Sequence, residues 1–410
     1  MTLPELTHRP LSSWEKWADA WLTFSTVFLG LFMLVSTAGT SIAMGALLLG
    51  CVMQGRRAWH LGLWRDPLVL WSLAFFAFIA IHEIVTVAAG KSPWGIIGSY
   101  GELWRLPIVL VAFALIRNRD LFWLALLTSA LILAALSWLH FMGLQVLAPE
   151  FFPARRITLG FGLVVVAWMA WSRSGSSNRP WMLRAISLAL VLTVLFAMDG
   201  RTAHVLVVFL AAWAGWIWSS PRWRWALALL LPVMVLAAAM MSKSVQSRMA
   251  DTLSAFGSPP VGGQVTSSGL RKEFFVIGAQ LAIENPWLGV GLSGIPEAYR
   301  EKIVEKAQAD ARWQPYAEPA VQRTSNLHNE YLMLWAGTGI AGVLMFLAWL
   351  ALPLFTRGLR PHQRHALTGL ILAFALGSFM NAWLLDFTPG HVYIVLLAWL
   401  MSERYRSSLQ

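Results

Sequence analysis

Uninterrupted apolar runs of nearly 20 residues recur along the chain and constrain its fold more than any other feature. A helix needs about 20 apolar residues to cross a bilayer, and α-helices satisfy their own backbone groups where no water is present. Of the 410 residues, 58% are hydrophobic and only 12% are charged, whereas soluble domains carry about 25% charged residues. We therefore predict an all-α polytopic membrane protein with about 12 transmembrane helices, at residues 19–35, 37–53, 67–88, 101–116, 120–143, 157–172, 183–198, 202–218, 225–241, 327–356, 366–385 and 390–402.

Two further features agree with membrane spans. Many tryptophans stand at the ends of the predicted spans beside arginines, as in Trp64 with Arg65, which is typical of the aromatic belts at membrane surfaces. Residues 1–19 are polar, so we expect the first span to be a retained anchor. Cys51 is the single cysteine and lies in an apolar run, so no intramolecular disulfide can form.

The distribution of Lys and Arg predicts the orientation of the spans. About 17 of these residues fall in the termini and in alternate short connections, and about 4 fall in the short connections on the other side. The positive-inside rule places the first set, and both chain ends, in the cytoplasm. The formal net charge of +11 would suggest nucleic-acid binding in a soluble protein, but this distribution accounts for it, so we expect no nucleic-acid partner.

One long connection interrupts the spans and divides the chain. We predict helices 1–9 in residues 1–241, a large extracytoplasmic loop in residues 242–326 and helices 10–12 in residues 327–410. Within the loop, the Pro- and Gly-rich residues 257–269 predict a mobile segment. Residues 270–283 place Leu270, Phe274, Ile277 and Leu281 on one stripe, which predicts an amphipathic helix on the membrane face, and residues 295–312 predict a solvated helix.

Charged residues gather at the extracytoplasmic ends of the predicted spans and, in the case of Arg271, at the start of the predicted loop helix. Charges near membrane depth are costly and are functional by default. Several arginines facing one cavity would suit an anion, because guanidinium groups match phosphate oxygens. A single such arginine is equally compatible with a lipid headgroup contact, and Glu102 with Arg105 is equally compatible with a structural ion pair. The residues concerned are Arg155, Arg156, Arg201, Arg271, Asp386, His391, Glu102 and Arg105.

His328 stands at the predicted start of the tenth span. We expect Ser325 and Asn326 to cap this helix and His328 to share a face with Gly339 and Gly342. The positive end of the helix dipole and nearby arginines would then keep the imidazole neutral. A neutral histidine facing a polar cavity is a candidate general base; a structural or substrate-binding histidine is the competing interpretation.

Other chemistries lack a supporting pattern. The sequence has no HExxH motif and no P-loop, so neither a metal site nor ATP-driven chemistry is predicted. We expect no metal and no cofactor. His362 and His365 lie in a basic cytoplasmic connection, where solvated side chains are expected.

The stretch His328-Asn329, nine residues, Gly339, two residues, Gly342 resembles the H-[NSQ]-x9-G-x2-[GTY] motif of O-antigen ligases. Residues 271–291 resemble the start of the same block in the wider Wzy-C superfamily, and the Asp199-Gly200-Arg201 turn matches where those proteins place an extracytoplasmic arginine. The predicted topology agrees with that family as well. The superfamily also includes O-antigen polymerases, some with R-x10-G repeats, a pattern we do not find in this sequence.

The resemblance implies a GT-C-like glycosyltransferase of the bacterial inner membrane with a periplasmic active site and cap. Such an enzyme transfers a glycan from undecaprenyl diphosphate to a hydroxyl of lipid A–core, in contact with membrane lipids, by an inverting displacement without metal. His328 would be the base, and Arg201 and Arg271 would bind the diphosphate. Further substrate-binding residues would be Arg155, Arg156, Asn329 and Asp386.

Three other classes of function stay open at this point. An O-antigen polymerase or a protein O-oligosaccharyltransferase would share the fold and chemistry and differ in acceptor. A lipid-linked glycan flippase is less favoured, because it predicts charges spread through the membrane depth. A membrane scaffold would leave the arginines and the His328 motif without a role.

Overall fold

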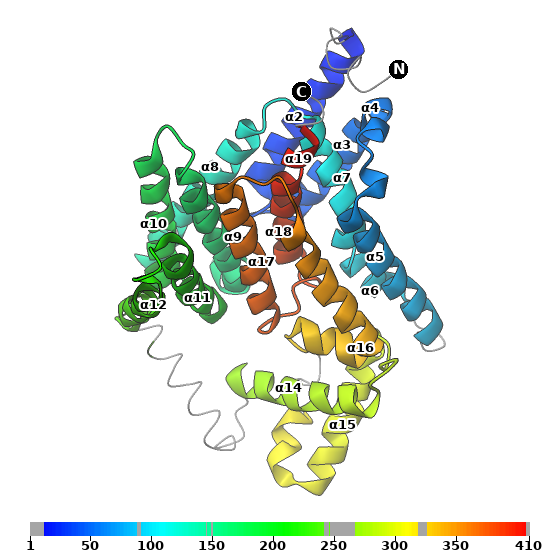
Figure 1. Cartoon of the computed structure of the whole chain (residues 1–410). Helices are drawn as coiled ribbons and strands as arrows, with labels where there is room; N and C mark the ends of the chain where they lie inside the picture. Colours follow the sequence, from blue (N-terminus) through cyan, green and yellow to red (C-terminus); the bar gives the residue numbers. More distant parts are fainter. Residues whose placement is uncertain are drawn as a thin grey trace.

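The computed structural model describes residues 12–87, 92–144, 146–148, 151–241, 246, 267–318 and 326–406. Its described residues form helices and connections without a strand, so the predicted all-α class is confirmed. Figure 1 shows a bundle of roughly parallel helices with a smaller helical cap at one end. The cap lies at the end opposite the C-terminal helix α19.

Each of the twelve segments predicted to span the membrane contains a helix. The bundle helices are α2 (Ser13–Phe32), α3 (Thr37–Met53), α4 (Gly55–His60), η1 (Leu63–Arg65), α5 (Pro67–Thr86), α6 (Trp94–Ser99), α7 (Glu102–Leu115), α8 (Asp120–Phe141), α9 (Phe151–Ser174), α10 (Pro180–Ala197), α11 (Arg201–Trp218), α12 (Arg224–Met240), α16 (Glu330–Ala351), η4 (Leu352–Phe355), α17 (Pro361–Ser378), α18 (Phe387–Met401) and α19 (Glu403–Arg406). The cap helices are α14 (Ser267–Glu284), α15 (Ile295–Ala309) and η3 (Ala311–Tyr316).

Fewer helices than the 12 predicted spans are long and apolar enough to cross a membrane alone. Seven meet that condition in the described residues, and an eighth does if α3 and the bent segment after it, at 83°, form one span. Others are shorter or more polar, such as the 17-residue α12 and the 15-residue α18. Exposed apolar side chains, including Ile42, Ile81, Val85 and Leu229, provide the surface that lipid would cover.

Local sequence signals explain where several helices begin. Asp66 caps α5 by accepting from the Leu68 amide at 2.8 Å, and Pro67 follows at the first helical position, where proline's missing N–H costs nothing. Ser12 forms a capping box with Glu15 at the start of α2. Asp66 also accepts from Arg404 and Tyr405, so the start of α5 is hydrogen-bonded to α19.

Helix α18 forms the centre of the bundle, because all its residues from Pro389 to Met401 are buried. It packs against α7, α9 and α17, with Tyr393 stacked on Phe374 at 4.1 Å between ring centroids. Close packing of this kind defines a single position for each helix end. The residues at the cap end of α18 are therefore held by the core.

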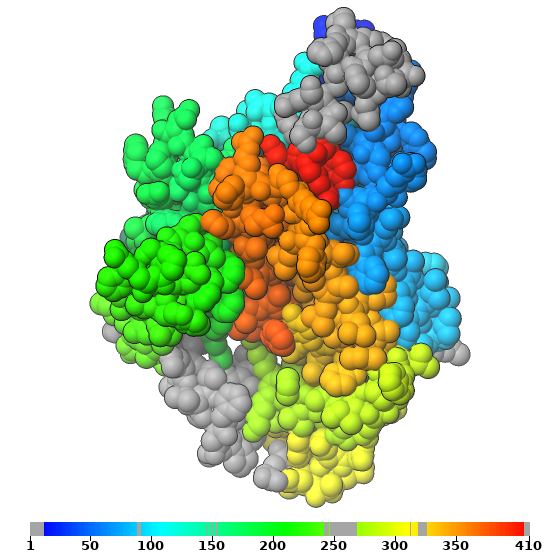
Figure 2. Space-filling model, in the orientation of Figure 1, coloured from blue at the N-terminus to red at the C-terminus, as the bar shows by residue number. Residues whose placement is uncertain are grey.

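The cap packs on the bundle through the predicted apolar stripe of α14. Phe274, Ile277 and Leu281 are buried, and α14 contacts α15 and α16, which appears in Figure 2 as a continuous surface from α16 onto the cap. The stripe therefore faces protein, and our expectation that it lies on the membrane face was wrong. Residues 257–266 of the predicted mobile segment lie outside the described residues, whereas Ser267 already belongs to α14.

Helix α16 is broken at Gly339, where the connection from α14 to α15 enters it. Gly339 has φ +70°, a conformation that glycine adopts without steric cost. Across the break, the amide of Ile340 donates to the Pro286 carbonyl at 2.9 Å, and the amides of Val290 and Gly291 donate to Ala336 and Gly337. The sequence predicted a continuous helical face through Gly339, and that prediction was wrong.

Helix α5 fixes the same connection from its other side. The Glu83 carboxylate accepts from the amides of Leu292 and Ser293, each at 2.9 Å, and His82 contacts the Leu288 carbonyl at 2.7 Å. Glu83 is fully buried, so these charge-assisted bonds form away from water, where they are strong. The cap is thus joined to α5 and α16 through backbone hydrogen bonds as well as apolar packing.

Candidate functional site

Three arginines from separate helices meet where the cap faces the bundle. Arg156 lies in α9, Arg201 is the first residue of α11 and Arg271 lies in α14, and all three line one cleft. The N-terminus of α11 adds the positive end of a helix dipole to the same place. The free volume of this cleft is only about 20 Å³, which leaves room for about one water molecule.

The pKa of Arg271 reflects its burial and the nearby positive charges. Burial lowers the pKa of the Arg271 guanidinium, the positive charges of Arg201 and Arg156 lower it further, and the Asp386 carboxylate opposes the shift. Like charges held together in a poorly solvated place repel one another. A bound anion would relieve that repulsion, so the cluster is electrostatically suited to a phosphate-bearing ligand.

Asn381 connects this cleft to His328. Its side chain accepts from Arg271 at 3.5 Å and donates to the Thr202 hydroxyl at 3.3 Å, and it lies close enough to the His328 ring to raise the pKa of that imidazole, whose buried Nδ1 has no hydrogen-bond partner in the described residues. The ring of His328 lies 5.5 Å from that of Phe274, measured between centroids. One amide therefore lies near the predicted base and contacts a predicted anion-binding residue.

The backbone of His328 is held in an unusual conformation. Its φ is +50°, and within the described ranges it is the one non-glycine residue with a positive φ. Its amide donates to the Asn326 side chain at 2.6 Å, a local bond that stabilises such a turn. A positive φ in a residue with a side chain is strained, and this kind of strain is concentrated at functional sites.

The helix after His328 begins later than the sequence suggested. Asn329, not Asn326, caps α16 by accepting from the Leu332 amide at 3.0 Å, so His328 precedes the helix. Burial lowers the pKa of His328, the charge of Arg271 lowers it further, and Asn381 opposes the shift. The imidazole is therefore neutral at pH 7, as expected; the effect of a nearby arginine was predicted, and burial, which was not, contributes most.

Asp386 and Arg155 differ in their relation to the cleft. Asp386 precedes α18, and burial raises the pKa of its carboxyl to about 6 while Arg271 opposes this, so it stands near the arginines. The guanidinium of Arg155 donates to the Val35 carbonyl at 3.0 Å and lies over the Phe151 ring at 4.6 Å. Arg155 is thereby directed to the turn between α2 and α3, and its predicted role in substrate binding gains no support from this geometry.

Glu102, Arg105 and His391 form a separate network between α7 and α18. Nδ1 of His391 lies 2.9 Å from a Glu102 oxygen, and Nε2 lies 3.3 Å from Arg105. Glu102 and His391 are each 1% exposed. These contacts join two helices of the core, which favours the structural interpretation of the three residues.

The O-antigen ligase family model, Wzy_C, matches residues 186–347. The chain carries an O-antigen ligase (Wzy_C) domain. The resemblance predicted from the His328 motif is thus confirmed. No curated protein sequence matches the chain.

The Wzy_C domain runs from α10 to α16 and contains Arg201, Arg271 and His328. The residues that complete the site come from outside it: Arg156 precedes the domain, and Asn381 and Asp386 follow it. The Wzy_C family supports a role in the membrane-bound ligase and polymerase superfamily and, in general, a lipid-linked glycan and lipid A–core as partners. With its apolar helices, the chain is a multi-pass membrane protein.

Sequence reasoning missed Asn381 and Glu330. Glu330 directly follows the His328-Asn329 pair, is fully buried, and accepts from the Tyr100 hydroxyl at 3.1 Å and the Leu384 amide at 2.8 Å. It thereby ties α16 to the connection that carries Asn381 and Asp386. A carboxylate in an apolar helix was the available signal, because such a group needs partners.

For metals, no cluster of three His, Cys, Asp or Glu side chains occurs in the described ranges.

Proposed function

We propose that this protein transfers an O-antigen glycan from undecaprenyl diphosphate to a sugar hydroxyl of lipid A–core, completing lipopolysaccharide. The observation that carries the proposal is the proximity of Arg271 and His328, on whose pKa the charge of Arg271 acts, both within the O-antigen ligase domain. It puts an anion-binding group next to a neutral base. Those are the two groups that displacement of a diphosphate by a hydroxyl requires.

The arginines bind the diphosphate of the donor. Arg201 and Arg271, with Arg156 beside them, neutralise the charge that grows on the leaving diphosphate as the glycosidic bond breaks. This removes the need for ATP and for a metal ion. Because the cleft has a free volume of only about 20 Å³, we expect α14 to move away from α11 as the donor enters and to close over it afterwards, a kind of motion common in enzymes.

His328 is the general base. Its neutral imidazole takes the proton of the acceptor hydroxyl while that oxygen attacks the anomeric carbon of the glycan. The bond from this carbon to the diphosphate oxygen breaks, and its electron pair leaves with undecaprenyl diphosphate. A single displacement inverts the anomeric centre. Asp386, which faces Arg271, and Asn329 are proposed to contact substrate.

The site faces the periplasm of a bacterium with its inner membrane around the bundle. Both chain ends are then cytoplasmic, and the loop 242–326 lies outside. The excess of arginine at the other end of the bundle supports this orientation. So do the exposed apolar side chains of Trp287 and Leu288 beside the break in α16, which suit contact with the bilayer surface.

Reconstitution with a single donor and three acceptors tests the proposal. Purified protein is given undecaprenyl diphosphate-linked glycan with lipid A–core, with a second lipid-linked glycan, or with a protein, and the products are separated by mass. We expect transfer to lipid A–core, unchanged by EDTA. Elongation of the second glycan would instead make the protein a polymerase, modification of the protein an oligosaccharyltransferase, and glycan movement without bond formation a flippase.

The arginines are tested with the same donor. Arg201→Ala and Arg271→Ala should each weaken donor binding about tenfold or more, since a charge-assisted hydrogen bond contributes about 1.5–3 kcal/mol. Arg179→Ala is the matched control, because Arg179 is exposed in the connection before α10. Unchanged donor affinity in both cleft variants would refute the diphosphate clamp.

A further inference from the structure

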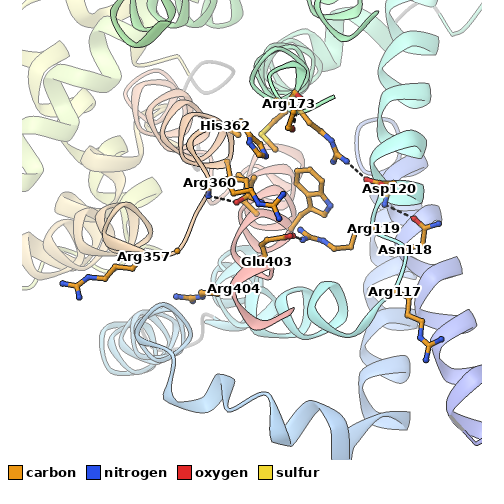
Figure 3. Close-up of a pocket in the computed structure, with 17 residues that line it drawn as sticks. Arg117, Asn118, Arg119, Asp120, Arg173, Arg357, Arg360, His362, Glu403 and Arg404 are labelled. Carbon is orange, nitrogen blue, oxygen red and sulfur yellow. Dashed lines mark hydrogen bonds and ion pairs between the residues drawn. The ribbon is translucent and has the colours of Figure 1, made fainter. Parts of the chain in front are cut away.

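A second cavity opens at the end of the bundle opposite the cap. It has a volume of about 830 Å³, within the range of about 300–1,000 Å³ typical of ligand sites. The connection between α7 and α8, the end of α9, the connection between η4 and α17, and the ends of α18 and α19 surround it. Figure 3 shows Arg119, Arg360, His362 and Glu403, which come from these separate segments, gathered near one space, whereas Arg117 and Arg357 extend away from it.

The lining is strongly basic. Six arginines and His362 line the cavity against two acidic residues, Asp120 and Glu403. Both acids are already paired, Glu403 with Arg119 and Asp120 with Arg173. Within the described residues, Arg357 and Arg360 take part in no ion pair. The cavity therefore keeps an excess of positive charge after its own acids are neutralised.

Aromatic contacts hold part of this charge in place. The guanidinium groups of Arg119 and Arg173 lie over the ring of Trp399, at 5.1 and 5.2 Å from its centroid, which is cation–π geometry. The ring of Trp399 thus holds two arginines of the lining near each other. The Trp399 indole N–H is buried and has no hydrogen-bond partner in the described part of the chain.

Arg360 and His362 add to the positive charge of the same cavity. Burial lowers the pKa of His362, the charges of Arg360 and Arg173 lower it further, and Glu403 opposes the shift. Figure 3 shows Arg360 and His362 near Glu403 and Arg173 directed to Asp120, with Arg357 and Arg117 extending outward. An excess of arginine at the cytoplasmic end is expected of any such protein; convergence on one concave cavity is not.

We propose that this cavity is a second binding site, which takes a phosphate-bearing anion at the cytoplasmic end of the bundle. The ligand is either the headgroup of an anionic phospholipid of the inner leaflet or a soluble phosphate compound. Arginine forks bind phosphate oxygens bidentately, and basic pockets between transmembrane helices bind anionic headgroups. The site is independent of the transfer site, because it lies at the other end of the bundle.

Binding to the delipidated full chain in neutral detergent tests this site. Native mass spectrometry measures binding of phosphatidylglycerol against phosphatidylcholine, and calorimetry measures binding of inorganic pyrophosphate. Arg360→Gln should weaken binding about tenfold, the effect of losing one charge-assisted bond of about 1.4 kcal/mol or more. Ser176→Glu, which adds a negative charge at the cavity wall, should weaken it as well and keeps every arginine.

Arg179→Gln is the matched control, an exposed arginine at the same end but outside the cavity lining. Selective binding of phosphatidylglycerol alone identifies a lipid site, and binding of pyrophosphate alone identifies a site for a soluble ligand. Equal binding of both phospholipids without pyrophosphate binding, no binding at all, or equal losses in the cavity and control variants would each overturn the proposal.

Discussion

Arg271 of the cap donates a hydrogen bond to Asn381 of the bundle, with 3.5 Å between guanidinium nitrogen and amide oxygen. Asn381 also donates to the Thr202 hydroxyl and lies near the His328 ring, whose pKa it raises. The position of the base and that of the anion site are therefore set by one side chain. Asn381 acts as a positioning residue, and its replacement should alter the behaviour of His328.

Asn381→Asp should move the acidic limb of the pH–rate profile to higher pH. In the natural protein, burial and Arg271 lower the pKa of His328, so the base form persists below pH 6.5 and activity falls only in more acidic solution. A carboxylate at position 381 would stabilise the imidazolium and raise that pKa. Transfer rates measured from pH 4.5 to 8 test this, with the exposed Asn178→Asp as control. An unmoved limb would contradict the contact.

Gly339→Ala should destabilise the fold. A Cβ at this position would lie 2.0 Å from the Trp287 carbonyl oxygen, and φ is +70°. Strain and overpacking each cost about 1–3 kcal/mol, so unfolding in detergent should occur at a clearly lower temperature. Gly45→Ala is the control, because a Cβ there meets nothing within 4 Å, and it should be neutral or stabilising. Equal melting temperatures for the two variants would contradict the close packing of Gly339 against the connection between α14 and α15.

Glu83→Gln should loosen the connection between α14 and α15. The Glu83 carboxylate accepts from the amides of both Leu292 and Ser293, and a carboxamide can accept only through one oxygen. Loss of one charge-assisted bond should speed hydrogen exchange of these amides about tenfold or more. Exchange measured by mass spectrometry checks this, with the exposed Glu301→Gln as control. Protection that stays at the natural level would show that α5 does not hold the cap.

Asp386→Asn should stabilise the protein at pH 8 and leave it unchanged near pH 4. Burial raises the pKa of Asp386 from 3.8 to about 6, so the fold favours the protonated carboxyl. The stability from this group is present below pH 3.8 and is lost as pH rises to about 6, a loss of up to about 3 kcal/mol. Melting temperatures at both pH values test the sign. A less stable variant at pH 8 would mean that attraction to Arg271 outweighs burial.

The helical bundle was predictable because hydropathy and helix length are local properties. Asp66-Pro67 marked the start of α5 correctly, since a cap acts within one turn. The start of α16 was placed too early, because Asn326 and Asn329 are both suitable caps, and only the fold selects Asn329. Apolar composition does not fix the exact length of a helix, and this length decides whether the helix can span the membrane. Helix α18, for example, has only 15 residues.

The functional site was only partly predictable, because contacts between distant parts of the chain bring some of its residues together. Charge at apolar span ends identified Arg201 and Arg271, because such charge is costly. Asn381 carries no comparable signal, and its bond to Arg271 joins residues 110 positions apart. Arg155 and Arg156 are adjacent and chemically identical, yet one bonds Val35 and the other lines the cleft. The direction of each side chain on α9 decides this, and the sequence pattern does not fix it.

The most direct measurement of the central claim is the rate of glycan transfer to lipid A–core by His328→Gln. Gln keeps hydrogen-bonding capacity but cannot take up a proton, and general-base catalysis contributes about 10²–10⁴-fold. We predict a loss of at least about 100-fold with donor affinity retained, whereas His365→Gln, at the opposite end of the bundle, keeps the natural rate. Transfer by His328→Gln within a few-fold of the natural rate would contradict the assignment of His328 as the base.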